Sequence, residues 1–259
     1  MRQPVRPTVR SLYVCDTFTI RHSGFPMLRS SPYKQLFGSI SARVALGIAM
    51  LVLSLALVLA STNFAKLQQL AQSRYGDQGA ATMQDWRDLV RRITPMPDGK
   101  KIEEVNDFFN ERVAFVDDIK VWKQKDYWAT PLETIGIRRG DCEDFSIAKY
   151  MTLQTAGTEI EKLRITYVKA KIGGRRSTIT QAHMIVAYYP TPNGEPLLLD
   201  NLIPDIRPAS RRADLEPVFG FNSAGLWVGG AAKPQVTNPG SKLSRWRDLV
   251  ARMQSDGFE

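Results

Sequence analysis

Three residues that could together perform thiol-dependent acyl transfer occur in the order Cys142, His183 and Asp200. A histidine beside a cysteine forms an ion pair that supplies a thiolate nucleophile and a proton for the leaving amine. A carboxylate on the other ring nitrogen fixes the tautomer and orientation of the imidazole. The residues taken singly have a plainer interpretation, namely a buried cysteine, a structural histidine in a strand and a turn-forming aspartate. Their order favours a Cys–His–Asp site.

The cysteine lies between acids in the stretch GDCEDFSIAKY, residues 140–150. A position at the start of a helix lowers the pKa of a thiol, whereas Asp141, Glu143 and Asp144 oppose the formation of a thiolate. An imidazolium, a bound cation or acid side chains directed away from sulfur would have to offset them. The acids either cap the helix or bind a hard cation such as Ca²⁺ through their carboxylates.

The elements that must position these residues follow from hydrophobic periodicity. Amphipathic spacing predicts helices first, and β-branched and aromatic runs separated by hairpin-length connections then predict antiparallel strands. This order indicates an α+β fold. The predicted helices are 61–93, 101–114, 142–156 and 244–254, the strands are 163–172, 182–190 and 197–202, and residues 203–217 are predicted as a loop.

The turn between the last two predicted strands gives their register. A hairpin turning at 190–196 pairs residues whose numbers sum to about 384, and His183 and Asp200 sum to 383. We therefore expect these two side chains to lie opposite or diagonal to each other.

Charge and hydropathy divide the chain into three parts. Residues 1–43 hold seven Lys/Arg and one acid, so this basic tail carries +6 of the formal net charge of +9 and leaves +3 for the rest. Residues 44–60 are apolar and uncharged, which predicts a membrane anchor or a signal segment with the tail in the cytoplasm. Residues 61–259 are then an exported domain. Its small net charge argues against nucleic acid as a partner.

The same topology places one cysteine and one histidine on each side of the membrane. Cys15 and His22 lie in the tail, so Cys142 and His183 are the one cysteine and the one histidine of the exported part. The two cysteines lie on opposite sides of the membrane and do not pair. An unpaired exported thiol indicates intermolecular pairing or a free thiol with a use.

Six motifs in order resemble the bacterial transglutaminase-like cysteine proteinases of the LapG type, over roughly residues 80–255. They are GDCEDFSIAKY, LRITYVKA, QAHMIVAYYPTP, EPLLLDNL, PASRRADLEPV and FNSAGLW. The resemblance implies a papain-like or transglutaminase-like core in which a nucleophile helix packs on an antiparallel sheet. It implies Cys142, His183 and Asp200 as nucleophile, base and orienting acid. It also implies Ca²⁺ bound by Asp141 and Glu143, with Asp144 as a further candidate ligand.

The same resemblance implies a biological setting. Such proteases act in the periplasm on the N-terminal retention region of a large surface adhesin, at a di-alanine site, and so promote biofilm dispersal. An inner-membrane receptor for cyclic di-GMP sequesters them. Two alternatives remain open from the residues themselves: a transglutaminase or amidase, because an amine can resolve the same acyl-enzyme, and a non-catalytic periplasmic binding module.

Overall fold

The computed structural model describes residues 62–173, 177–192, 194–229, 231 and 233–258. The predicted basic tail and the apolar segment 44–60 lie outside these residues. Within the described part, no helix combines the length and the apolar character needed to cross a membrane.

A six-stranded antiparallel sheet forms one layer of the fold, with the strand order β6-β5-β4-β3-β7-β8. Its central pair, β3 and β4, is joined by a hairpin connection, as the sequence predicted. The strands are β3 (Leu163–Lys171), β4 (Thr180–Tyr188), β5 (Leu197–Leu199), β6 (Arg207–Pro208), β7 (Leu215–Phe221) and β8 (Leu226–Val228).

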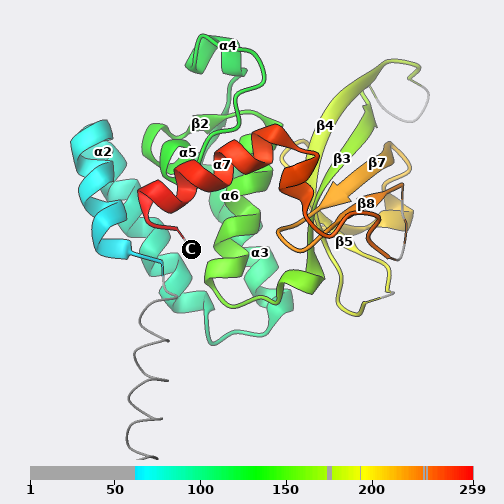
Figure 1. The fold of residues 1–259 in the computed structure, drawn as a ribbon, viewed down its shortest axis with the longest axis horizontal. Coiled ribbons are helices and arrows are strands. Elements are labelled where there is room, and N and C mark those ends of the chain that lie inside the picture. Colours follow the sequence, from blue (N-terminus) through cyan, green and yellow to red (C-terminus); the bar gives the residue numbers. More distant parts are fainter. Residues whose placement is uncertain (1–61, 174–176, 193, 230, 232, 259) are drawn as a thin grey trace, which may run out of the picture. The chain divides into compact units, whose positions relative to one another are not determined.

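Helices form the second layer, and Figure 1 shows them gathered beside the sheet with α6 next to it. Helix α6 (Cys142–Thr155) packs on β4 and β3, and on its other sides it contacts α3 and α5. Every α6 residue from Asp144 to Leu153 is therefore buried. The other helices are α2 (Phe64–Ile93), α3 (Asp98–Arg112), α4 (Asp118–Val121), α5 (Pro131–Ile137) and α7 (Ser244–Asp256).

The predicted α+β class is confirmed, with local corrections. Helix α2 is interrupted at Gly76, whose φ of 66° and ψ of −163° are not helical. Helix α3 begins at Asp98, directly after Pro97, although Pro97 and Gly99 had predicted a later start. The predicted loop 203–217 contains β6 and the first residues of β7, because β7 pairs with β3 and continues the sheet across it.

A short parallel pair, β1 (Ala114–Phe115) with β2 (Arg139–Gly140), lies outside the large sheet. Val116 extends the pairing by donating its backbone N–H to the carbonyl of Gly140 at 2.9 Å. This pairing brings the chain after α3 against the residues that precede Cys142. It thus joins two segments that are about 25 residues apart in the sequence.

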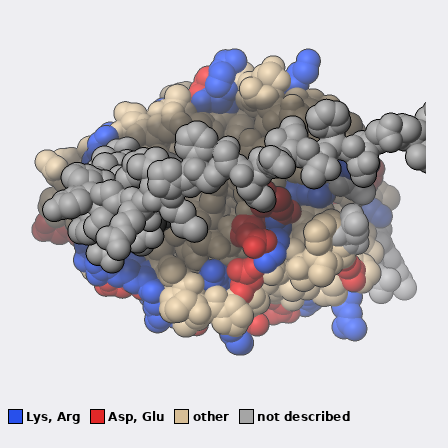
Figure 2. Space-filling model, turned by 60° about the horizontal axis from the view of Figure 1, so that its bottom comes forward, with Lys and Arg blue, Asp and Glu red and all other residues tan. Residues whose placement is uncertain are grey.

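Charged side chains of both signs lie interspersed over the described surface on the face shown in Figure 2. This arrangement fits the small net charge that the sequence assigns to the residues after the basic tail.

Candidate active site

Cys142 is the first residue of α6, and Asp141 is its N-cap. The thiol of Cys142 donates a hydrogen bond to Oε2 of Glu143 at 3.0 Å. Burial raises the pKa of the Cys142 thiol, the negative charges of Glu143 and Asp141 raise it further, and the backbone N–H of Met184 lowers it. The acidic side chains are therefore not all directed away from the sulfur, because Glu143 accepts its hydrogen bond. A thiolate at Cys142 requires positive charge nearby.

His183 and Asp200 form the second part of the site. Their side chains are buried, and Nε2 of His183 lies 2.7 Å from Oδ1 of Asp200. His183 comes from β4, and Asp200 directly follows β5. Burial alone would raise the pKa of Asp200, but hydrogen bonds from His183, the backbone of Leu202 and Arg212 lower it to about 2. The carboxylate is therefore ionised beside the imidazole.

The register explains this contact. Val186 pairs with Leu199, so opposed residues of β4 and β5 sum to 385, one more than predicted. Asp200 is then two positions away from the residue that extension of the pairing would place opposite His183. Diagonal neighbours of this kind lie within reach of each other across an antiparallel pair.

The backbone at Asp200 is held from the helical layer by a buried lysine. Lys149 of α6 donates to the side-chain oxygens of Asn106 and Asn110, both at 2.8 Å, and to the carbonyl of Asp200 at 3.0 Å. Asn110 also donates to that carbonyl at 2.9 Å. Burial lowers the pKa of Lys149 to about 7, while the charge of Asp200 opposes this shift. The nucleophile helix and the loop of the acid are thus fixed to each other.

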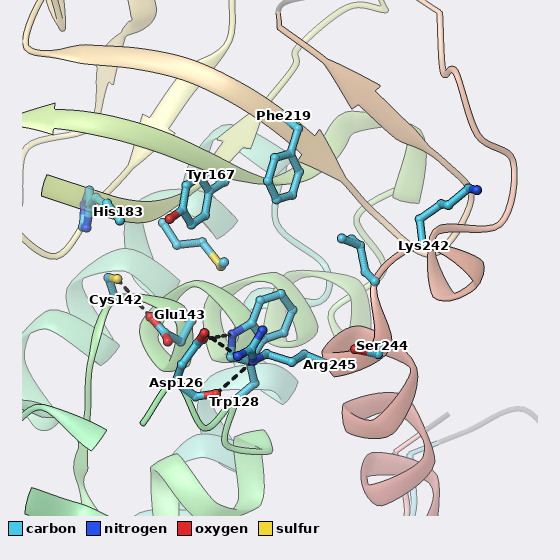
Figure 3. Close-up of a pocket in the computed structure, with 13 residues that line it drawn as sticks. Asp126, Trp128, Cys142, Glu143, Tyr167, His183, Phe219, Lys242, Ser244 and Arg245 are labelled. Carbon is cyan, nitrogen blue, oxygen red and sulfur yellow. Dashed lines mark hydrogen bonds and ion pairs between the residues drawn. The ribbon is translucent and has the colours of Figure 1, made fainter. Parts of the chain in front are cut away.

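Cys142 and His183 line one cavity of about 420 Å³. Figure 3 shows both side chains at one end of this cavity, with Tyr167 and Phe219 on the wall formed by the sheet. These two rings stack, with centroids 5.3 Å apart and an interplanar angle of 6°. The other end is lined by residues at and before the start of α7: Lys242, Leu243, Ser244 and Arg245. An extended peptide could lie along such a groove beside the thiol.

Three carboxylates meet next to this cavity. One oxygen each from Asp118, Asp141 and Asp144 lies within 4.8 Å of the others. Asp118 is brought here by the β1–β2 pairing, and Asp144 fits because Gly140 has no side chain: a Cβ on Gly140 would lie 2.6 Å from that of Asp144. Oδ1 of Asp118 and Oδ1 of Asp141 are buried with no hydrogen-bond partner among the described residues.

Burial and nearby negative charge perturb all three carboxylates. Burial and then Asp141 raise the pKa of Asp118 to about 6, and burial and then Glu143 raise the pKa of Asp141 to about 8. The pKa of Asp144 is also well above its usual value, through burial and through the charges of its neighbours. Buried carboxylate oxygens without partners, held this close, fit a hard cation that takes oxygen ligands at flexible geometry, such as Ca²⁺.

The structure assembles the predicted residues with two differences. Asp141 and Asp144 lie in the carboxylate trio. Glu143 accepts from the thiol, and one of its oxygens also lies within 4.8 Å of ligand atoms of Asp141 and Cys142, so its role as a metal ligand stays a prediction. Sequence reasoning missed Asp118, because no spacing relates it to the GDCED motif. The sequence also assigned no role to Arg212, which contacts Asp200, or to Lys149 of the predicted nucleophile helix, which contacts the backbone of Asp200.

A thiol at a helix start, a His–Asp pair on an antiparallel sheet and a cavity lined by both the thiol and the imidazole define a thiol-dependent hydrolase or transferase of papain-like architecture. The sequence profile of the family described as bacterial transglutaminase-like cysteine proteinase matches residues 79–213. The chain belongs to this family.

Solved structures agree with this assignment. LapG of Legionella pneumophila is 39% identical, with a TM-score of 0.63, over 75% of this chain and 99% of that chain. The EGTA-treated form of that protein is 38% identical with a TM-score of 0.64, again over 75% and 99% of the two chains. The calcium-bound form is 39% identical with a TM-score of 0.62, over 73% and 98%. No curated protein matches the chain.

Proposed function

We propose that the chain is a calcium-dependent cysteine endopeptidase with Cys142 as nucleophile, His183 as base and Asp200 as the orienting acid. The observation that carries this proposal is the buried 2.7 Å contact of His183 Nε2 with Asp200, made by a histidine that lines the same cavity as Cys142. The alternative of a structural cysteine and histidine does not account for a cavity that both residues share.

The mechanism follows from the nitrogen of His183 that is already hydrogen-bonded to Asp200. Asp200 accepts the hydrogen bond from Nε2–H of His183, which leaves Nδ1 to take the proton of the Cys142 thiol. The thiolate attacks the peptide carbonyl, and the imidazolium protonates the leaving amine. Water, deprotonated by the same Nδ1, then hydrolyses the acyl-enzyme and restores the thiol.

Calcium belongs to this proposal because the carboxylate trio fits it. Asp118, Asp141 and Asp144 would hold the ion, and two of them offer buried oxygens without partners. When bound, Ca²⁺ supplies positive charge beside a thiol whose acidic neighbours oppose ionisation. The calcium-bound form of the Legionella protein supports calcium binding by this chain.

The substrate and setting are proposed on the family resemblance. The substrate is the N-terminal retention region of a large surface adhesin, whose cleavage releases the adhesin and disperses a biofilm. The protease acts in the periplasm after export through residues 44–60, which anchor it in the inner membrane if they are not cleaved. An inner-membrane receptor for cyclic di-GMP is the proposed sequestering partner.

The test is digestion of an adhesin N-terminal fragment by the full chain in Ca²⁺. Cys142→Ala is expected to abolish cleavage without loss of the circular dichroism spectrum, because a small residue at the first position of a helix does not carry the core. Cys15→Ala, which removes the chain's other thiol, is the matched control and should cleave normally. His183→Ala is expected to be as inactive as Cys142→Ala.

Cleavage that persists in Cys142→Ala would remove this residue as the nucleophile. A second assay with a glutamine donor peptide and a labelled amine distinguishes the transferase alternative, since an amine product in place of two fragments would identify a transglutaminase. A chain that performs neither reaction and does not react with a thiol-directed probe would be a binding module.

A further inference from the structure

A buried arginine contacts Asp200 on the oxygen that faces away from His183. Nη2 of Arg212 donates to Oδ2 of Asp200 at 2.7 Å. The side chain of Arg212 is 1% exposed and that of Asp200 is fully buried. The two oxygens of Asp200 therefore have different tasks: Oδ1 accepts from His183 and from the backbone N–H of Leu202, and Oδ2 accepts from Arg212.

Asp214 in turn fixes the guanidinium of Arg212. Nε of Arg212 lies 3.0 Å from Oδ1 and 3.2 Å from Oδ2 of Asp214, and Nη2 lies 2.8 Å from Oδ2. The backbone is fixed as well, because the N–H of Arg212 donates to the carbonyl of Ala209 at 2.9 Å and its carbonyl accepts from Leu215 at 3.0 Å. The planar guanidinium thus presents one N–H to Asp200 in one direction.

The charges of this group also match the chemistry. Asp200, Arg212, Asp214 and a neutral His183 together carry one net negative charge, and protonation of His183 brings the sum to zero. Without Arg212, Asp200 and Asp214 would lose the one guanidinium that pairs with both of them, and Oδ2 of Asp200 would be left buried without this partner. Leaving a buried charge unpaired in this way is costly.

We propose that Arg212 is a positioning residue for the reaction, which holds the carboxylate of Asp200 in the orientation that directs Oδ1 at His183. This inference rests on the proposed function of Cys142, His183 and Asp200. Arg212 does not line the cavity that Cys142 and His183 share, so its loss should lower kcat and leave KM nearly unchanged. We expect a loss of about 10- to 100-fold, the range found when partners that orient functional groups are removed.

The experiment compares four variants of the full chain in Ca²⁺: Arg212→Met, Arg212→Lys, Asp214→Asn and Arg207→Met. Arg212→Lys keeps the charge but loses the planar fork, so it should recover part of the activity of Arg212→Met. Asp214→Asn weakens the contacts that fix Arg212. Because Asp214 is partly exposed, this variant should fold even if Arg212→Met does not. Arg207→Met is the matched control, because Arg207 is a partly exposed arginine of the same segment that pairs with exposed Asp205 at 2.6 Å.

Two readouts are measured on each variant. Every variant and the wild-type reference also carry His22→Gln, which leaves His183 as the single histidine of the chain. The first is kcat and KM for the adhesin fragment. The second is the NMR signal of the Nε2–H proton of His183 in histidine labelled with ¹⁵N, which reports its hydrogen bond to Asp200 without any need for turnover. A residue that only stabilises the fold would lower the melting temperature and leave both the signal and the kcat of the folded fraction unchanged.

The proposal expects a broadened or lost Nε2–H signal and a reduced kcat in Arg212→Lys and Asp214→Asn, with both readouts unchanged in Arg207→Met. An Nε2–H signal that persists unshifted in Arg212→Lys and Asp214→Asn would overturn the proposal. If the wild type cleaves nothing, the proposed function fails, and the signal still decides whether Arg212 positions Asp200.

Discussion

The carboxylate trio gives a prediction in which the loss of a charged group stabilises the protein. Burial and the charge of Asp141 raise the pKa of Asp118 from 3.8 to about 6, so the ionised carboxylate opposes folding above that pH. A shift of about two units corresponds to about 3 kcal/mol at neutral pH. Solvent screens part of this repulsion, and we expect Asp118→Asn to raise the free energy of unfolding of the metal-free chain by about 1–2 kcal/mol.

The assay is thermal unfolding at pH 7.5 in EGTA and in excess Ca²⁺. In EGTA, Asp118→Asn should melt about 2–8 °C above the wild type, since 1 kcal/mol corresponds to about 2–4 °C for a domain of this size. In Ca²⁺ at about 100 times its Kd, the wild type should gain about 2.7 kcal/mol, and the variant should gain less than half of this. Asparagine retains the oxygen that accepts from the backbone of Tyr127, so this contact is kept.

Asp117→Asn is the matched control, because Asp117 precedes Asp118, is exposed and pairs with Lys120 at 3.3 Å. This variant should change neither melting temperature appreciably. The reasoning would be refuted if Asp118→Asn melted below the wild type in EGTA and kept the full stabilisation by Ca²⁺. Asp118 would then be a structural residue of the loop.

Three further predictions concern the metal, a buried lysine and the membrane topology. EGTA should stop cleavage of the adhesin fragment and Ca²⁺ should restore it where Mg²⁺ does not, because Mg²⁺ demands a tighter octahedral shell; full activity in excess EGTA would remove the metal from the site. Burial lowers the pKa of Lys149 to about 7, whereas its unfolded value is near 10.5, so between these values the unfolded chain binds more protons and stability rises with pH by up to about 1.4 kcal/mol per unit. Urea unfolding in saturating Ca²⁺ should show a smaller rise from pH 7 to 9 in Lys149→Met, and equal slopes in the two proteins would contradict this. A fusion of alkaline phosphatase after residue 75 should be active, and an inactive one together with a fluorescent cytoplasmic fusion would reverse the proposed topology.

Most of the fold could be predicted because its elements carry local signals. Helical spacing and the Asp141 N-cap predicted α6 to within one residue, and β-branched runs predicted β3, β4 and β5. The loop prediction for 203–217 was wrong where β6 and β7 form, because the pairing of β7 with β3 depends on residues some 50 positions apart. Prolines at 208 and 217 argued locally for a loop, and the sheet tolerates them at an edge strand and at an irregular pairing.

Some residues of the site could likewise be predicted from the sequence, and others could not. The sequence by itself determined the candidate nucleophile, base and acid, because Cys142 and His183 are the single residues of their kinds after the apolar segment and a hairpin register relates His183 to Asp200. Only the tertiary structure decided that Asp118 joins Asp141 and Asp144, that Arg212 holds the far oxygen of Asp200, and that Glu143 turns toward the thiol. The physical reason is that spacing along one helix or hairpin is fixed by backbone geometry, whereas contacts between distant segments depend on how whole elements pack.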